Sequence, residues 1–349
     1  MKNLFKKKSV IICLLLFLIG VPVMSFVMVH SLYTKNFVRV EMPEYSGWLH
    51  YDDLNGYDRT MVEFQSGDNL LTGYIYGEEN TKGLVVIAHG LGGGAESYMA
   101  ETVYFVDAGW KVFAYDCTGS YRSEGDSTAG LPQSALDLDA ALGYAKELNW
   151  NLPVMLYGHS WGGYAVGAVL NYNHNITAAA SISGYATPME LLDEQSGEIM
   201  GGLSKILYPF EMIYQKARFG DAADLSAVEG INKSGIPVMI IHGTKDQAIK
   251  YDGAAIIAHK DDITNPQVVY KTCDTEGHDG HNNLFMSDES QAYVDEINAE
   301  YLELNEKYEG EIPDGEKQNF YADVDKFLTS SLDVEFMDEV NTFFENSLR

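Results

Sequence analysis

The chain has 349 residues, enough for one large α/β domain or two smaller ones. Hydrophobic residues make up 46% of it and aromatic residues 12%, which allows a sizeable core and excludes disorder throughout. With 51 acidic and 23 basic residues the formal net charge is −28, which repels phosphate backbones and argues against a nucleic-acid partner.

Residues 1–34 are predicted to form a signal anchor. Four lysines among the first eight residues precede an uncharged apolar run, residues 9–29, which is long enough to span a bilayer. The lysines before the run favour an N-terminus on the inner side. The sequence therefore predicts a single-pass cell-membrane protein with residues 35–349 outside the cytoplasm. The alternative is a secreted protein whose signal is cleaved, although Ser25 and Ser31 offer only weak cleavage positions.

Residues 35–56 are expected to be a linker, and residues 57–349 the folded domain. Two alternating strands, 59–64 and 69–76, open this domain as a hairpin. From Leu84 onward, continuous apolar strands alternate with helices, which is typical of a parallel sheet covered on both faces. The expected strands are 84–88, 111–115, 154–157, 178–182, 238–241 and 268–272. The expected helices are 96–108, 134–148, 163–171 and one that begins near Tyr251.

A glycine-rich loop, His89-Gly90-Leu91-Gly92-Gly93-Gly94, follows the strand 84–88. Glycines keep such a loop free of side chains where a substrate must approach. The same loop also satisfies the dinucleotide-binding pattern Gly-x-Gly-x-x-Ala, with Asp116 at the end of the next strand. That alternative predicts a nicotinamide enzyme. A hairpin precedes this strand, however, whereas a dinucleotide fold usually begins with it.

The most informative stretch is Gly158-His159-Ser160-Trp161-Gly162, between the strand 154–157 and a helix-compatible segment. A serine at such a turn is held on a strained elbow, with its hydroxyl exposed above the sheet edge. Only small residues two positions before and after it let the turn close. The backbone N–H groups of Trp161 and Leu91 are expected to form an oxyanion hole.

Between the strands 178–182 and 238–241, residues 185–235 form an insertion. It lies above the carboxyl ends of parallel strands, where ligands bind, and is therefore predicted to be a helical cap or lid. The alternative is a peripheral helical excursion with no role in the site. The tail, residues 284–349, is expected to be helical, acidic and largely solvated.

A serine nucleophile needs a positioned base, and the base needs an acid that orients it. Asp246 follows the strand 238–241 and lies on the same rim of the sheet as Ser160. Two histidines, His278 and His281, follow the last strand. His281 is favoured as the base because it immediately precedes an amphipathic segment, and His278 is the alternative. The pair lacks helical i, i+4 spacing and further ligands, so no metal is predicted.

This set of residues resembles the α/β-hydrolase superfamily, and within it the serine aminopeptidase and monoacylglycerol-lipase-like branch. The resemblance covers about residues 59–284. It implies a mostly parallel eight-stranded sheet with helices on both faces and a helical cap. It also implies Ser160 as nucleophile, Asp246 as acid, His281 (or His278) as base, and no cofactor.

One segment departs from the branch. After the fourth strand its members commonly read Asp-x-x-Gly-x-Gly-x-Ser, whereas residues 116–123 carry Tyr121 in place of the second glycine. Because this loop flanks the pocket, the departure concerns the substrate side of the site.

The predicted function is that of a serine hydrolase acting on a small-molecule acyl substrate through an acyl-enzyme intermediate. Cleavage of a carboxylic ester, as by an esterase or lysophospholipase, is the first expectation. A serine peptidase or aminopeptidase of the same fold is the nearest alternative. A catalytically silent binding protein that uses the hydrolase fold is a second alternative, from a different class.

Overall fold

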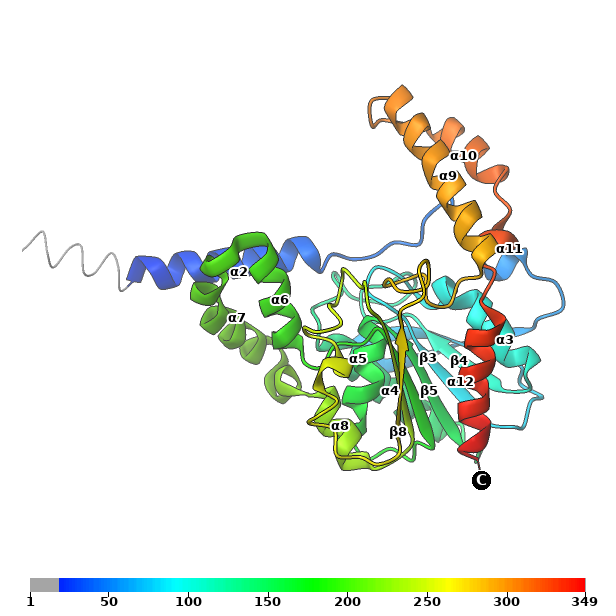
Figure 1. Ribbon diagram of the computed structural model, residues 1–349, viewed down its shortest axis with the longest axis horizontal. Helices are drawn as coiled ribbons and strands as arrows, with labels where there is room; N and C mark the ends of the chain where they lie inside the picture. Colours follow the sequence, from blue (N-terminus) through cyan, green and yellow to red (C-terminus); the bar gives the residue numbers. More distant parts are fainter. Residues whose placement is uncertain (1–18, 349) are drawn as a thin grey trace, which may run out of the picture.

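The computed structural model describes residues 19–348, and a sheet of eight strands forms its centre (Figure 1). The strand order is β1-β2-β4-β3-β5-β6-β7-β8. β1 and β2 form an antiparallel hairpin, β2 pairs antiparallel with β4, and the remaining pairs are parallel. The predicted mostly parallel eight-stranded sheet is therefore confirmed. The strands are β1 (Arg59–Ser66), β2 (Asn69–Tyr76), β3 (Leu84–Ala88), β4 (Lys111–Tyr115), β5 (Val154–His159), β6 (Ala178–Ile182), β7 (Val238–Gly243) and β8 (Val268–Cys273).

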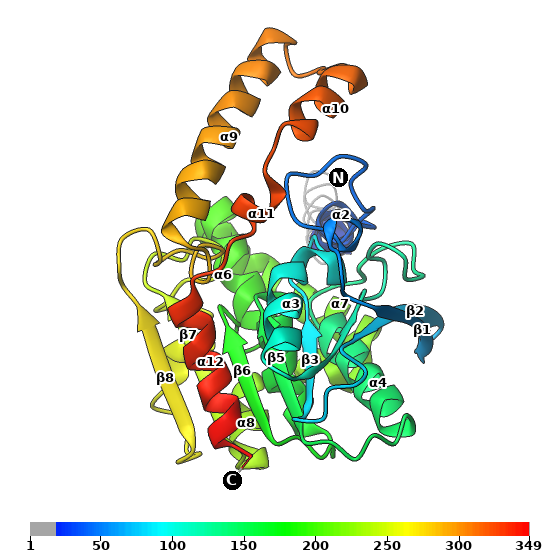
Figure 2. The ribbon, with the colours of Figure 1, turned by 90° about the vertical axis from the view of Figure 1, so that its right-hand side faces the viewer.

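Helices cover both faces of the sheet, because successive side chains of a strand point to opposite faces. On β3, Val86 and its alternate neighbours pack with α4 (Gln133–Glu147), α5 (Trp161–Ala168) and α8 (Ala227–Ser234). Val85 and Ile87 pack on the other side, in a core to which α3 (Met99–Asp107) and α12 (Val334–Asn346) contribute (Figure 2). Two apolar cores explain why the central strands are continuous runs of apolar residues rather than alternating ones.

Two helices extend beyond the carboxyl edge of the sheet, after β6. They are α6 (Pro188–Met200) and α7 (Ser204–Phe219), which lie at one end of the molecule in Figure 1. The next helix, α8, returns to the sheet, where Ala227 and Ile231 are buried in the same core as α5. Of the insertion 185–235, α6 and α7 therefore form the part that stands over the sheet edge.

The predicted membrane anchor is wrong. Among residues 19–348, no helix combines the length and the apolar character needed to cross a bilayer. Residues 1–18, which hold the first part of the predicted run 9–29, lie outside the described residues. The rest of the run lies mostly in α2 (Val21–Asn36), which packs along α7. The predictions of a membrane partner and of a single-pass membrane protein are corrected with it.

Aromatic contacts hold α2 on α7. The rings of Phe26 and Phe210 meet edge to face with centroids 5.3 Å apart, and the rings of Tyr33 and Tyr214 lie 4.7 Å apart. Val29 and Tyr33 are buried by this packing. Hydropathy alone does not separate such a helix from a membrane span, since both remove apolar side chains from water.

The chain after α2 lies against the domain rather than apart from it. Lys326 on α11 (Lys326–Thr329) pairs with Asp53 at 2.9 Å, and the backbone N–H of Leu49 donates to Ser330 Oγ at 2.9 Å. The preceding helices α9 (Asp288–Lys307) and α10 (Asp314–Ala322) project away from the body of the molecule (Figures 1 and 2). The C-terminal segment then returns along the sheet as α12.

The helix expected from Tyr251 is not found in this part of the structure, which has turns and a short 3₁₀ helix, Ile256–His259. The backbone N–H of Ala254 donates to Glu194 Oε2 at 2.8 Å, and that of Ile256 donates to the Gly184 carbonyl at 2.9 Å. The groups that a helix would bond internally are therefore bonded to α6 and to the loop after β6.

Candidate active site

Ser160 lies on a strained turn between β5 and α5. Its backbone has φ 58° and ψ −115°, in the left-handed half of conformational space that residues other than glycine rarely adopt. A Cβ on Gly158 would lie 2.2 Å from the Gly162 carbonyl oxygen, and one on Gly162 would lie 1.9 Å from the Ala88 carbonyl oxygen. Both positions therefore require glycine, because the backbone of α5 passes directly against β5 and β3.

Three of the four residues proposed from the sequence for nucleophile, acid and base meet at the carboxyl edge of the sheet. His281 Nε2 lies 2.8 Å from Ser160 Oγ, and His281 Nδ1 lies 2.7 Å from Asp246 Oδ2. Because a carboxylate only accepts, His281 Nδ1 carries the proton and Nε2 is free to accept from the serine hydroxyl. This arrangement can remove the proton of Ser160 and stabilise the resulting imidazolium.

Asp246 is held as a carboxylate. Burial by itself would raise the pKa of Asp246, but hydrogen bonds from His242, His281 and the backbone outweigh burial and hold this pKa well below its usual range. His242 Nε2 lies 3.1 Å from Asp246 Oδ2, and the N–H groups of Ala248 and Ile249 both donate to Oδ1 at 2.9 Å. No motif in the sequence marks His242 for this role, although it lies four residues before Asp246 at the end of β7.

His278 lies away from Ser160. Its Nε2 is 2.8 Å from Asp288 Oδ1, in the first turn of α9, and Gln291 Nε2 lies 3.1 Å from its Nδ1. The spacing of the two histidines did not decide between them. In the folded chain His281, and not His278, contacts the serine.

The two amides predicted to bind an oxyanion are those of Leu91 and Trp161. Both residues line the same cavity as Ser160. No acceptor for either N–H occurs among the described residues. His89 is fully buried and positions the Leu91 amide. Its Nδ1 donates to the Gly90 carbonyl at 2.7 Å, and its Nε2 accepts from the Cys117 amide at 2.9 Å. Since the C=O and N–H of a trans peptide point in opposite directions, holding the Gly90 carbonyl sets the direction of the Leu91 N–H. Burial lowers the pKa of His89 to about 4, so this ring is neutral near pH 7.

A second chain of hydrogen bonds joins the loop at Gly90 to the loop at His281. The Gly90 amide lies 3.0 Å from the Tyr98 hydroxyl, which lies 2.8 Å from His159 Nδ1, and His159 Nε2 lies 2.9 Å from the His281 carbonyl. A carbonyl only accepts, so His159 Nε2 donates. Burial lowers the pKa of His159 to about 3, so its neutral ring accepts from Tyr98 at Nδ1. No sequence motif marks Tyr98 or His159 for a role in linking these loops, because the contacts join segments that are distant in the sequence.

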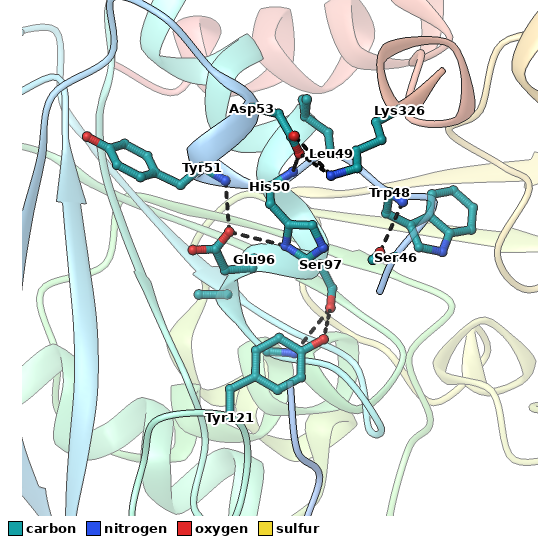
Figure 3. A network of polar contacts seen from close by, with 12 residues as sticks. Ser46, Trp48, Leu49, His50, Tyr51, Asp53, Glu96, Ser97, Tyr121 and Lys326 are labelled. Carbon is teal, nitrogen blue, oxygen red and sulfur yellow. Dashed lines mark hydrogen bonds and ion pairs between the residues drawn. The ribbon is translucent and has the colours of Figure 1, made fainter. Parts of the chain in front are cut away.

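A cavity of about 740 Å³ opens on Ser160 and His281. Helices α2, α6 and α7 contribute one group of lining residues, and segments 46–50 and 329–332 contribute another. Figure 3 shows residues of segment 46–53 around Glu96, which accepts from the Tyr51 amide at 2.8 Å. Arg59 also donates to Glu96, at 2.5 Å. Burial would raise the pKa of Glu96, but hydrogen bonds from His50, Tyr51 and Arg59 lower it to about 2. Residues 46–53 are thus part of the cavity's surroundings.

Comparison with known proteins agrees with this geometry. The model of the serine aminopeptidase family S33 matches residues 79–209, which include the glycine-rich loop, the serine elbow and α6. This match covers less than half of the chain, and the order and direction of the eight strands are those of the α/β-hydrolase fold.

Solved structures of similar fold include esterases and a peptidase. The Pyrococcus furiosus esterase Pf2001 superposes with a TM-score of 0.54 at 19% identity, covering 78% of this chain and 98% of that one. Est1E of Butyrivibrio proteoclasticus, bound to ferulic acid, has a TM-score of 0.48 at 20% identity, covering 69% of this chain and 97% of that one. The acylaminoacyl peptidase of Pyrococcus horikoshii has a TM-score of 0.49 at 16% identity, covering 66% of this chain and 39% of that one. The first of these shows the shared fold. No curated protein sequence matches the chain.

Tyr121 forms part of the cavity wall. Its φ is 42°, which explains why the branch usually has glycine at this position. A Cβ on Gly94 would lie 2.3 Å from the Tyr121 ring, so the ring packs directly on the glycine-rich loop, and its hydroxyl lies 3.0 Å from Ser97 Oγ (Figure 3). The departure from the family pattern thus replaces open space with an aromatic side chain.

Asp116 does not have the surroundings that dinucleotide binding requires. It is fully buried, and its carboxylate accepts from the Ala95 amide at 2.8 Å and from the Tyr74 hydroxyl at 2.9 Å. A ribose would need this carboxylate at the surface of the crevice. The glycine-rich loop therefore fits the oxyanion interpretation and not the nicotinamide alternative.

Proposed function

We propose that this hydrolase cleaves carboxylic esters through an acyl-enzyme intermediate on Ser160. The observation that carries the proposal is the continuous contact from Asp246 through His281 to Ser160, at 2.7 and 2.8 Å, beside a cavity that can admit a drug-sized molecule. No other assignment in this chain gives the strained serine a base within hydrogen-bonding distance among the described residues.

The proposed reaction has two balanced steps. His281 Nε2 accepts the Ser160 proton as Oγ attacks the ester carbonyl, while the Leu91 and Trp161 amides bind the oxyanion. The carbonyl re-forms, the alkoxide leaves with the proton from His281, and an acyl-serine remains. Water then gives a proton to His281 and attacks the acyl group. The bond from the acyl carbon to Oγ breaks, His281 returns the proton to Ser160 Oγ, and the carboxylic acid is released. Asp246 remains ionised and stabilises the imidazolium in both steps.

Fluorophosphonate labelling tests the nucleophile. The full chain is expected to react with the probe, and Ser160→Ala is expected to remove all labelling, because the probe traps only an activated serine. Ser46→Ala is the matched control, since Ser46 also lines the cavity but only accepts from the Trp48 amide. Labelling that persists in Ser160→Ala would reject the nucleophile. An unlabelled wild-type chain would favour a silent binding protein.

A peptidase of the same mechanism is the second candidate, favoured by the match to the serine aminopeptidase family over residues 79–209. Ester and amide substrates with the same acyl group separate the two. We expect turnover of p-nitrophenyl esters and little release from the corresponding aminoacyl p-nitroanilides. Faster cleavage of the anilides, relative to their uncatalysed rates, would support the peptidase instead.

Tyr98→Phe tests the chain of hydrogen bonds between Gly90 and His281. The variant keeps the ring but leaves the Gly90 amide and His159 Nδ1 without their partner, at a cost of about 1–3 kcal/mol. We expect kcat on p-nitrophenyl acetate to fall about tenfold with little change in KM. Tyr57→Phe, which removes a hydroxyl bonded to Asp107 at the surface, should leave both constants unchanged. A Tyr98→Phe variant with wild-type kcat would show that this contact positions nothing in the reaction.

A further inference from the structure

The cavity wall between α2, α6 and α7 contains buried oxygen atoms without hydrogen-bond partners. Glu211 on α7 and Tyr33 on α2 both line the cavity, with exposed fractions of 3% and 5%. Glu211 Oε1 accepts from Ser196 Oγ at 3.1 Å, but among the described residues neither Glu211 Oε2 nor the Tyr33 hydroxyl has a partner. Such atoms are rare in folded proteins because each one costs the free energy of its lost hydration.

A further acceptor lies one helical turn from Glu211. Gln215 is four residues later on α7 and therefore on the same side of the helix. Its Nε2 donates to the sulfur of Met189 at 2.9 Å, whereas its buried Oε1 lacks a donor within the described part of the chain. Of these three groups only Glu211 and Tyr33 line the cavity, and a carboxylate oxygen such as Glu211 Oε2 needs a hydrogen-bond donor.

The charge on the cavity wall also favours a ligand that donates hydrogen bonds. Three carboxyl groups, those of Glu96, Glu101 and Glu211, line the cavity, and among its described lining residues there is no lysine or arginine. Arg59 compensates Glu96, whereas burial raises the pKa of Glu101 to about 7 and also raises that of Glu211. A substrate anion would meet these groups without a cation to pair with it, which is unfavourable in a buried site.

The cavity that Glu211, Tyr33 and Ser160 share also has apolar lining residues. Helix α6 contributes Leu191 and Leu192 to it, and α2 contributes Val29 and Leu32. An apolar substrate chain therefore finds matching surface in the cavity that contains both Ser160 and Glu211.

We propose that Glu211 and Tyr33 form a polar subsite of the cavity that binds a hydrogen-bond-donating group, a hydroxyl or an ammonium, at the end of an apolar substrate chain. This inference rests on the proposed ester hydrolysis and gives it a substrate class: esters whose chain ends in a donor, in preference to those ending in a methyl or a carboxylate. Glu211 is the acceptor that both donor types share, and Tyr33 contributes a hydroxyl from the N-terminal helix.

Matched ester series test the subsite. One series is p-nitrophenyl esters of straight-chain acids of increasing length, and the other is acetates of straight-chain alcohols, so that either side of the ester can be examined. Each length ends in methyl, hydroxyl, ammonium or carboxylate. At the best length we expect kcat/KM for a hydroxyl or ammonium end to exceed that for a methyl end by about tenfold, and the carboxylate end to be the poorest.

Variants assign this preference to the subsite. Glu211→Leu is expected to bring the donor-to-methyl ratio close to one, and Tyr33→Phe to reduce it. Glu211→Gln should keep the hydroxyl preference and lose the ammonium preference, which separates the two donors. Glu198→Gln on α6, whose carboxylate pairs with Lys250 at the surface, is the control with unchanged ratios.

Hydrolysis of p-nitrophenyl acetate, which is too short to reach the subsite, separates the two proposals. If the wild-type chain does not cleave it, the proposed function fails. If acetate is cleaved but the methyl-ended chains are preferred, or the donor preference survives in Glu211→Leu, the subsite is rejected. A misfolded Glu211→Leu would also lose acetate turnover, and Tyr33→Phe and Glu211→Gln then provide the test.

Discussion

Replacing His281 with alanine is expected to lower kcat for p-nitrophenyl acetate by about a millionfold, the loss typical of removing the base of a serine hydrolase. The reason is its position: His281 is the histidine 2.8 Å from Ser160 Oγ and 2.7 Å from Asp246. Without it, the serine hydroxyl has no acceptor for its proton. The rates of purified, folded variants measured at one pH and at saturating substrate provide the comparison.

His278→Ala is the control within the same loop. His278 contacts Asp288 and Gln291 instead of the serine, so its loss should change kcat by less than about twofold. Comparable circular dichroism spectra would confirm that both variants fold. An inactive His278→Ala beside an active His281→Ala would reverse the assignment of the base.

Gly162→Ala is expected to have the largest effect on stability. The new Cβ would lie 1.9 Å from the Ala88 carbonyl oxygen and 3.0 Å from that of His89, both of which are backbone atoms that cannot rotate away. Relief requires α5 to move off β3, and α5 is a fully buried helix at the centre of the larger core. We expect a loss of about 5 kcal/mol or more, which approaches the whole stability of many domains.

Gly143→Ala in α4 is expected to raise the stability of the protein, in contrast to Gly162→Ala. No atom lies within 4 Å of a Cβ at this position, and alanine is a better helix former than glycine by about 0.5–1 kcal/mol. Urea unfolding followed by circular dichroism should show a midpoint above wild type for Gly143→Ala, with Gly162→Ala unfolded or insoluble without urea. If the Gly162→Ala protein unfolds at the wild-type midpoint, the close approach of α5 to β3 is not required.

Features encoded in contiguous residues were predictable. The strand boundaries and the two-sided burial of the sheet follow from short apolar runs, and the fold class follows from their alternation with helices. The turn at Ser160 is local in part: a Cβ on Gly158 would meet the Gly162 carbonyl four residues later, whereas Gly162 must be small because of Ala88 on β3. The helix expected at Tyr251 failed because bonds to α6 and to the loop after β6 replaced those of a helix.

Other features depended on partners far away in the chain. The apolar segment that ends at Val29 reads equally well as a membrane span or a buried helix, and only its packing on α7 decides for the residues described. The choice of His281 over His278 required the position of Ser160, more than a hundred residues earlier.

By itself, then, the amino-acid sequence determined the hydrolase fold, the strained serine and the order of its candidate partners, because steric limits and hydrophobic periodicity act over a few neighbouring residues. Only the tertiary structure decided which histidine reaches the serine, that Tyr98 and His159 link the two loops, and that Glu211 and Tyr33 face one cavity. Each of these features brings together side chains from segments that are distant in the sequence. They depend on how the helices and strands pack, which the pattern of any one segment does not encode.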